Sequence, residues 1–224
     1  MKKYGEDKHY NEKNPYRRFD IINYLIEKNN YINYLEIGVR VPQACFNRIV
    51  AEHKDGVDWL PQAPEINYPM MSDDFFDLIR GHEDIKYNII FVDGAHIHRV
   101  AKRDVLNSFN HLTDNGTIVM HDCNPPSKWH QRPEHEYDGN EAWNGTAWRA
   151  YVEFRCLKKD LSMHVVDTDE GVGIIQFGKQ ETWIIDDMEK CLEYEYLDKN
   201  RKKLLNLISV EEFERLYPNG RYIK

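Results

Sequence analysis

Two short stretches decide the fold of this chain: Val92-Asp93-Gly94-Ala95-His96 and Met120-His121-Asp122-Cys123-Asn124. Each ends a run of apolar residues, 87–92 and 116–120, that is typical of a buried strand. Between them, apolar residues recur at helical spacing over 97–112. A strand, a helix and a strand of these lengths predict a βαβ unit with parallel strands. Both polar stretches are therefore expected at the carboxyl edge of one sheet, where open α/β sheets bind their ligands.

Composition limits the classes of protein that fit this chain. Its 224 residues are 41% hydrophobic, which is enough for one α/β domain with additions. A formal charge of −8 argues against a general nucleic-acid binder. No apolar run approaches the ~20 residues of a membrane span, and the N-terminus lacks the apolar core of a secretory signal. We expect a cytoplasmic protein without a membrane partner, with four scattered cysteines as reduced thiols.

Periodicity divides the chain into three parts. Residues 1–29 are expected to form an N-terminal arm and helix, 30–180 the α/β domain, and 181–224 a charged helical tail. Residues 123–144 are rich in aromatic and polar groups without periodicity, and they are expected to form a lid over the ligand edge, or else an ordinary insertion. The remaining predicted strands are 32–37, 54–57, 162–166 and 172–177, and the remaining predicted helices are 15–28, 42–50, 73–79, 145–157, 186–207 and a short one capped by Ser209.

The first predicted strand ends in a pattern that suits nucleotide binding. Glu36 lies two residues before Gly38, and a glycine there lets the backbone approach a ligand closely. The dinucleotide fingerprint is absent, because Arg40 and Gln43 occupy its later positions. Asp58 follows the second strand, where a carboxylate accepts both hydroxyls of a ribose. The alternatives are a solvent or helix-start role for Glu36 and a turn role for Asp58.

Taken together, five motifs resemble a known family. Their order is that of class I S-adenosylmethionine-dependent methyltransferases, and the chain is most similar to the small-molecule O-methyltransferase-like branch whose fourth strand ends in Asp-Gly-x-His. The similarity covers roughly residues 30 to 177. It implies a Rossmann-like, doubly wound, mostly parallel seven-stranded sheet with helices on both faces. The motifs are Glu36-Ile37-Gly38, Asp58, Met71-Ser72-Asp73, Val92-Asp93-Gly94-Ala95-His96 and His121-Asp122.

The resemblance also implies how S-adenosylmethionine would bind. Glu36 and Gly38 would flank its methionine part, Asp58 would hold its ribose, and Ser72 and Asp73 would lie by its adenine. When no metal is present, Asp93 would contact the cofactor or orient His96, and Asp122 would face the acceptor. Arg40 stands where the family commonly has further glycines, so it either obstructs the cofactor or contacts its carboxylate.

The two polar stretches carry the expected chemistry. Methyl transfer to a hydroxyl requires alignment of the acceptor and removal of its proton. His96 is the predicted general base, as a neutral imidazole, with a structural histidine as the alternative. Related metal-dependent methyltransferases bind Mg²⁺ here, and Asp93 and Asp122 match their layout, with His121 or Asn124 as third ligand. A histidine ligand suits a softer divalent cation better.

The substrate is expected against the lid. Trp129, His130 and Trp143, together with Asn124, are the predicted substrate residues, since stacking faces and polar groups suit a sugar or an aromatic acceptor. Arg17 and Arg18 are most simply part of a solvated face.

The sequence thus predicts a methyltransferase that acts on a hydroxyl of a small molecule, with a carbohydrate as the leading guess. The competing hypothesis is a non-catalytic Rossmann domain that acts by binding as a subunit. A nicotinamide oxidoreductase is disfavoured by the missing fingerprint. The oligomeric state stays open, with a homo-oligomer among the alternatives.

Overall fold

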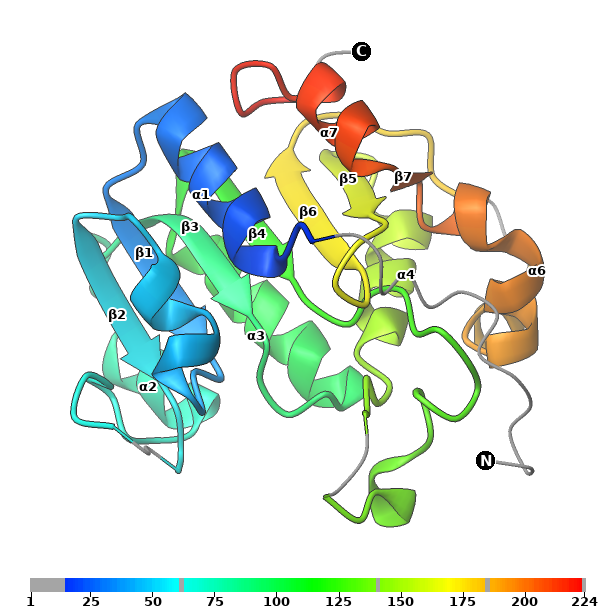
Figure 1. Cartoon of the computed structure of the whole chain (residues 1–224), viewed down its shortest axis with the longest axis horizontal. Coiled ribbons are helices and arrows are strands. Elements are labelled where there is room, and N and C mark those ends of the chain that lie inside the picture. The colour runs from blue at the N-terminus through cyan, green and yellow to red at the C-terminus, as the bar shows by residue number, and fades with distance from the viewer. Residues whose placement is uncertain (1–14, 61–62, 140–141, 184–185, 223–224) are drawn as a thin grey trace.

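A seven-stranded sheet forms the centre of the computed structural model, which describes residues 15–60, 63–139, 142–183 and 186–222 (Figure 1). The strand order is β2-β1-β3-β4-β6-β5-β7. Strands β2, β1, β3 and β4 are mutually parallel, β6 is antiparallel to β4 and β5, and β7 is parallel to β5. The strands are β1 (Asn33–Ile37), β2 (His53–Val57), β3 (Tyr87–Val92), β4 (Leu112–Met120), β5 (Leu161–Val166), β6 (Val172–Phe177) and β7 (Leu207–Ile208).

Helices cover both faces of this sheet, which confirms the predicted Rossmann-like fold. Helices α1 and α7 share one hydrophobic cluster with the sheet, whereas α2, α3, α4 and α6 share the other. Figure 1 shows α1 lying across the sheet on the viewer's side. The helices are α1 (Arg18–Asn29), α2 (Ser72–Leu78), α3 (His98–Asn110), α4 (Trp148–Leu157), α5 (Met188–Cys191), α6 (Tyr194–Leu204) and α7 (Val210–Leu216), with single 3₁₀ turns at Pro42–Ala44, Phe46–Arg48 and Glu134–Glu136.

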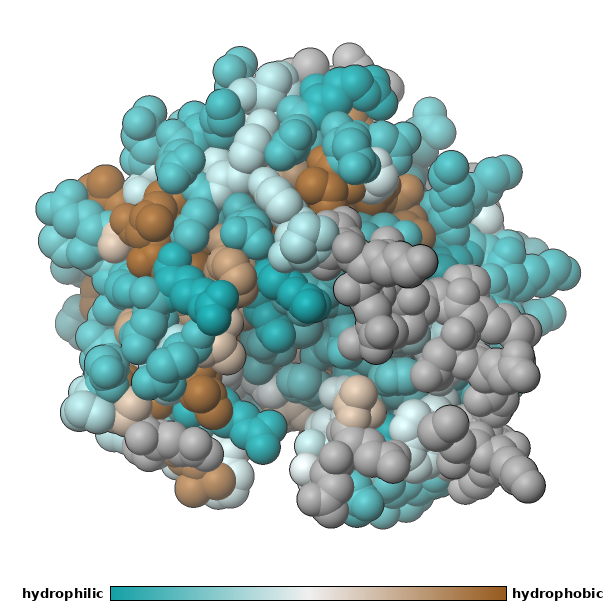
Figure 2. All heavy atoms as spheres, in the orientation of Figure 1, coloured by the Kyte–Doolittle hydropathy of each residue, from teal (hydrophilic) through white to brown (hydrophobic). Residues whose placement is uncertain are grey.

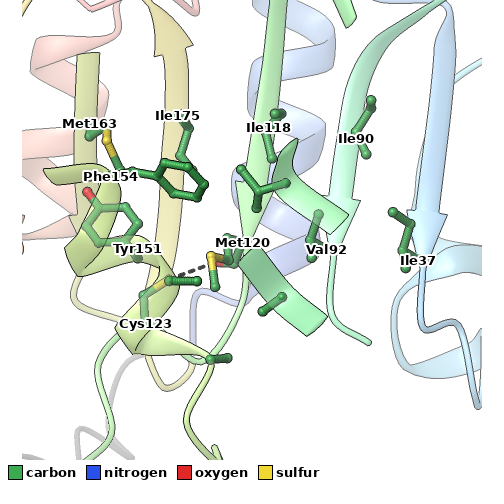
Figure 3. Packing of buried hydrophobic residues seen from close by; sticks show 14 of the residues in the cluster. Ile37, Ile90, Val92, Ile118, Met120, Cys123, Tyr151, Phe154, Met163 and Ile175 are labelled. Carbon is green, nitrogen blue, oxygen red and sulfur yellow. Dashed lines mark hydrogen bonds between the residues drawn. The ribbon is translucent and has the colours of Figure 1, made fainter. Parts of the chain in front are cut away.

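The apolar runs of the strands follow from this two-sided burial. In β3, Ile89 packs into the α1 cluster and Ile90 into the α3 cluster, and both are fully buried. Figure 3 shows part of the second cluster, in which Phe154 of α4 lies beside Ile175 of β6. Because neither face meets water, successive residues are apolar instead of alternating. Trp148 of α4 is fully buried, as expected of a core residue.

Three local predictions were wrong. The helix predicted over 42–50 is two 3₁₀ turns, because Cys45 (φ −142°, ψ −64°) interrupts them and the Asn23 side chain bonds the backbone of Arg48 and Val50. The residue before α2 is Met71, and Ser72 does not cap this helix. The single helix predicted over 186–207 is split into α5 and α6 and ends in strand β7.

The structure tests the prediction for the C-terminal end of the chain but not the prediction for its first residues. The predicted arm over 1–14 and residues 140–141 of the predicted lid lie outside the described residues. The capping box of Ser209 and Glu212 is present at the start of α7, as predicted.

The surface is mainly hydrophilic on the face shown in Figure 2, with apolar patches between charged groups. Across the described ranges, we find no helix with the length and apolar character needed to cross a bilayer.

Candidate functional site

Three ionisable side chains meet at the carboxyl edge of the sheet, where β3 and β4 end. We call Asp93, His96 and Asp122 the edge cluster. The His96 Nε2 atom lies 3.3 Å from Asp93 Oδ1, and its Nδ1 atom lies 3.0 Å from Asp122 Oδ2. Each residue offers one ligand atom, and these atoms all lie within 4.8 Å of one another. The βαβ unit therefore brings together the residues that the sequence placed at two strand ends.

Two carboxylate oxygens of the edge cluster lack hydrogen-bond partners. Within the described part of the chain, Asp93 Oδ1 and Asp122 Oδ2 are buried without a hydrogen bond, and both are the atoms nearest to His96. A buried acceptor without a donor costs about 1–3 kcal/mol. Such oxygens next to an imidazole are a suitable ligand set for a divalent cation such as Mn²⁺. The residues present therefore fit a metal ion.

The third member of this ligand set differs from the predicted one. The prediction named His121 or Asn124, but His121 Nδ1 lies 3.1 Å from the Arg18 guanidinium. The Asn124 amide donates to Asp167 and accepts from Arg201, so it is held inside the fold. Asn124 was also a predicted substrate residue; its side chain is 3% exposed, and the role stays a prediction. Geometry thus favours His96 as the group that completes the set.

Arg18 is the site residue that the sequence analysis missed. It is half-buried at the start of α1, and its Nη1 atom donates to Asp93 Oδ2 at 2.9 Å. Its Nε atom lies 3.0 Å from Asp169 Oδ2, which also accepts the Arg18 backbone N–H. The prediction of a solvated face was therefore wrong for Arg18. No local pattern marks it, because only the packing of α1 on the sheet brings it to the edge cluster.

These contacts shift the pKa values of the clustered groups. Burial opposes charging of His96, but Asp122 and Asp93 outweigh it and raise the pKa of His96 to about 9. Burial and Arg18 oppose charging of His121 as well, yet Asp122 and Asp93 raise its pKa well above the ordinary value. Burial disfavours ionisation of Asp93, but His121, His96 and Arg18 hold its pKa well below the ordinary value. At neutral pH the resting His96 is therefore an imidazolium, not the predicted neutral imidazole.

The predicted cofactor residues at the end of β1 are close to the edge cluster. Gly38 has φ +90°, and a Cβ there would lie 2.2 Å from the Asp93 carbonyl oxygen, so only glycine fits this approach of β1 to β3. Glu36 is 2% exposed and accepts a hydrogen bond from Tyr34. Burial raises its pKa to about 8. Glu36 is therefore no solvent residue, which removes one of the alternatives.

The ribose and carboxylate candidates lie in the next loop. Asp58 accepts the backbone N–H groups of Arg40 at 2.7 Å and Leu60 at 2.8 Å. It therefore serves as a turn residue in the structure, and each oxygen retains a further lone pair for a ligand. The Arg40 side chain is exposed, with a backbone φ of +45°.

The predicted adenine residues bind the neighbouring helix. Asp73 forms a two-point ion pair with Arg103 of α3, with both distances at 2.5 Å. Burial raises the pKa of Asp104, on the same helix, to about 7, although a hydrogen bond from Ser72 opposes the shift. Ser72 and Asp73 therefore join α2 to α3 at the start of α2.

The predicted substrate residues of the lid fall into two groups. The Trp143 ring stacks on His96, with ring centres 5.5 Å apart, and on Tyr137 at 4.5 Å. His130 is buried and bonded to Ser127, whereas Trp129 is covered by a guanidinium 3.8 Å away. Trp143 thus lies at the edge cluster, but the stacking faces pack against groups of the lid and of the edge cluster, which leaves no open aromatic wall.

Sequence comparison shows which known family part of the chain is similar to. Residues 36–123 match a family model described as a methyltransferase domain. The matched segment runs from the end of β1 to just past the end of β4, so it contains the whole edge cluster. None of the curated proteins matches the chain significantly.

The solved structures that are similar to this chain have low sequence identity. MycE, a methyltransferase from mycinamycin biosynthesis described in complex with Mg, SAH and mycinamycin VI, is 13% identical with a TM-score of 0.45 over 73% of this chain. A Corynebacterium glutamicum protein is 10% identical (TM-score 0.49), covering 75% of this chain and 84% of its own. SAH-bound PaMTH1 of Podospora anserina is 14% identical (TM-score 0.45), covering 72% and 78%. The chain spans 50% of the length of MycE.

Proposed function

We propose that this protein is a class I methyltransferase that transfers a methyl group from S-adenosylmethionine to a hydroxyl oxygen of a small molecule. One observation carries the proposal: the edge cluster lies at the carboxyl edge of a sheet, inside a segment that matches a methyltransferase domain. That edge is the ligand-binding edge of open α/β sheets. The alternative of a purely binding domain gives no reason for two buried carboxylates to share one imidazole.

His96 is the proposed general base. It would accept the proton of the acceptor hydroxyl while oxygen attacks the methyl carbon in line with the breaking carbon–sulfur bond. Asp93 and Asp122 would stabilise the imidazolium that forms, because each places a carboxylate oxygen within 3.3 Å of a ring nitrogen. Since His96 must be neutral to act, the rate is expected to rise with pH towards about 9.

A divalent cation is the second part of the proposal. Asp93 Oδ1, Asp122 Oδ2 and a His96 nitrogen would hold it, which makes His96 either the base or a ligand. Bound there, the ion would supply positive charge that orients an acceptor hydroxyl and lowers its pKa. Arg18 occupies the other oxygen of Asp93, so it orients this carboxylate without competing for Oδ1.

The proposed cofactor contacts follow the loops around the edge cluster. Glu36 and Gly38 would lie beside the methionine part, Asp58 beside the ribose, and Ser72 and Asp73 beside the adenine. The exposed Arg40 stands at the rim of this loop, within reach of a cofactor carboxylate entering from solvent.

The proposed acceptor is a small polyhydroxylated molecule such as a carbohydrate. Around the edge cluster lie the charged or hydrogen-bonding side chains of Arg18, His121 and Asp169, which contact one another. Stacking of a sugar on an open aromatic ring is no longer the main support for this choice, because the Trp143 ring stacks on His96. Hydrogen bonding to hydroxyls supports it instead.

Calorimetric titration with S-adenosylhomocysteine, with and without Mn²⁺ or Mg²⁺, tests the cofactor and the metal. We expect micromolar binding and a dependence on the cation. Methyl transfer to a panel of sugars then tests the acceptor, and His96→Ala should lower its rate at least ~100-fold with cofactor affinity unchanged. Absence of binding in every condition would refute the proposal in favour of a domain that binds a different partner.

A further inference from the structure

The last two residues of the predicted lid and the two residues after them contact the edge cluster through several separate groups. We call residues 143–146 the clamp. The Trp143 ring stacks on His96 at an interplanar angle of 15°, and its carbonyl oxygen accepts a hydrogen bond from His96 Nδ1 at 3.0 Å. Asn144 Nδ2 donates to Asp122 Oδ1 at 2.7 Å. We propose that Trp143 and Asn144 are positioning residues that fix the orientation of His96 and Asp122.

The backbone of the edge cluster needs such support. His96 has φ +54° and Asp122 has φ +59°, a region that side-chain-bearing residues rarely adopt. Such conformations persist where the surroundings hold them. The Thr146 N–H donates to the His96 carbonyl oxygen at 2.8 Å, and a Cβ on Gly145 would lie 2.2 Å from that oxygen. The clamp therefore packs directly on the strained backbone of His96, and glycine is what permits this approach.

Asn144 is placed to orient Asp122. It is fully buried, and among the described residues its Oδ1 atom has no hydrogen-bond partner. The oxygen of the Asn144 amide therefore makes no hydrogen bond, while its nitrogen donates to Asp122 Oδ1. Because Asn144 bonds Oδ1 of Asp122, Oδ2 of Asp122 is left to face His96, with 3.0 Å between Oδ2 and His96 Nδ1. Asn144 in turn is anchored in the lid, where its backbone N–H donates to the His130 carbonyl oxygen at 2.8 Å.

The clamp connects the lid to the edge cluster. Trp143 Nε1 donates to the Arg132 carbonyl oxygen at 2.7 Å, so the indole is fixed from the lid side as well. The consequences for methyl transfer rest on the proposed function, but the orientation of His96 and Asp122 does not. The experiment therefore has one readout without ligand and three with ligand.

The variants are Asn144→Leu, Trp143→Leu and Trp143→Phe in the full chain, with Ser127→Ala as the control. Ser127 is a buried lid residue that bonds His130 and lies outside the clamp. Without ligand, the His96 ring resonances, assigned with His96→Asn, are expected to move downfield in Trp143→Leu, because shielding by the indole is lost. They should stay shielded in Trp143→Phe and in Ser127→Ala.

With ligand, Mn²⁺ affinity and kcat are expected to fall at least ~10-fold in Asn144→Leu, as is typical for groups that orient metal ligands. S-Adenosylhomocysteine affinity should change less than ~3-fold, and Ser127→Ala should match the wild type. Wild-type resonances without shielding, or Asn144→Leu with unchanged Mn²⁺ affinity and kcat, would overturn the inference. A wild type that binds neither Mn²⁺ nor S-adenosylhomocysteine refutes the proposed function instead, and the resonance shift then decides the role of Trp143 alone.

Discussion

Replacement of His96 should change how stability depends on pH. The pKa of His96 is raised from 6.5 to about 9, because Asp122 and Asp93 outweigh the effect of burial. One pKa unit corresponds to about 1.4 kcal/mol, so the charged imidazole contributes about 3 kcal/mol to the free energy of unfolding. For a raised pKa this stabilisation is complete below pH 6.5 and is lost as the pH rises through about 9. His96→Asn removes it, and asparagine tolerates the positive φ at this position.

Urea unfolding at pH 6 and pH 10 measures this contribution. Other groups titrate in both proteins, so the informative quantity is the difference between them. Between these pH values, the wild type should lose about 3 kcal/mol more than His96→Asn. The exposed His53, which lies far from the edge cluster in β2, supplies the control, and His53→Asn should follow the wild type. Equal losses in the wild type and His96→Asn would show that the two carboxylates do not stabilise a charged His96.

Three further changes have expected outcomes. Arg18→Met leaves two half-buried aspartates without their cation and should lower the free energy of unfolding, measured with urea, by about 3 kcal/mol. Arg17→Met, at 45% side-chain exposure, should lower it by less than about 1 kcal/mol. Gly38→Ala should cost at least about 3 kcal/mol, because its Cβ would meet backbone at 2.2 Å, and Gly81→Ala, with a similar φ but open space, about 1 kcal/mol; equal melting temperatures would contradict this. In initial-rate assays, kcat/KM should rise between pH 6 and 9 in proportion to neutral His96, and a flat profile would exclude it as the base.

The local sequence pattern was sufficient to predict the strands of the sheet other than β7 and to place Asp93 and Asp122 at the site. The largely apolar runs 87–92 and 172–177 coincide with β3 and β6, because strands buried on both faces carry apolar residues in succession instead of in alternation. The chirality and length of the βαβ unit then place Asp93 and Asp122 at one edge. Strand β7 escaped prediction, since two residues carry no period of their own and pair only after α6 has brought them to β5.

The remaining contacts depend on residues that are distant in sequence. Arg18 reaches Asp93 across 75 positions and Asn144 reaches Asp122 across 22, and neither has a local signal. Cys156 and Cys191 were expected as scattered thiols, yet their sulfur atoms lie 3.8 Å apart where α4 meets α5.

The sequence by itself determined the strands other than β7, their order along the chain and the residue types at their carboxyl ends. These features follow from short-range periodicity and from the handedness of one connection. Only the tertiary structure decided the charge state and direction of those residues. A pKa and a side-chain orientation depend on every charge and donor within a few ångströms, and here Arg18 and Asn144 come from α1 and from the lid. The sequence at the ends of β3 and β4 thus predicts which residues form the edge cluster. Their charge state and orientation depend on α1 and on the lid.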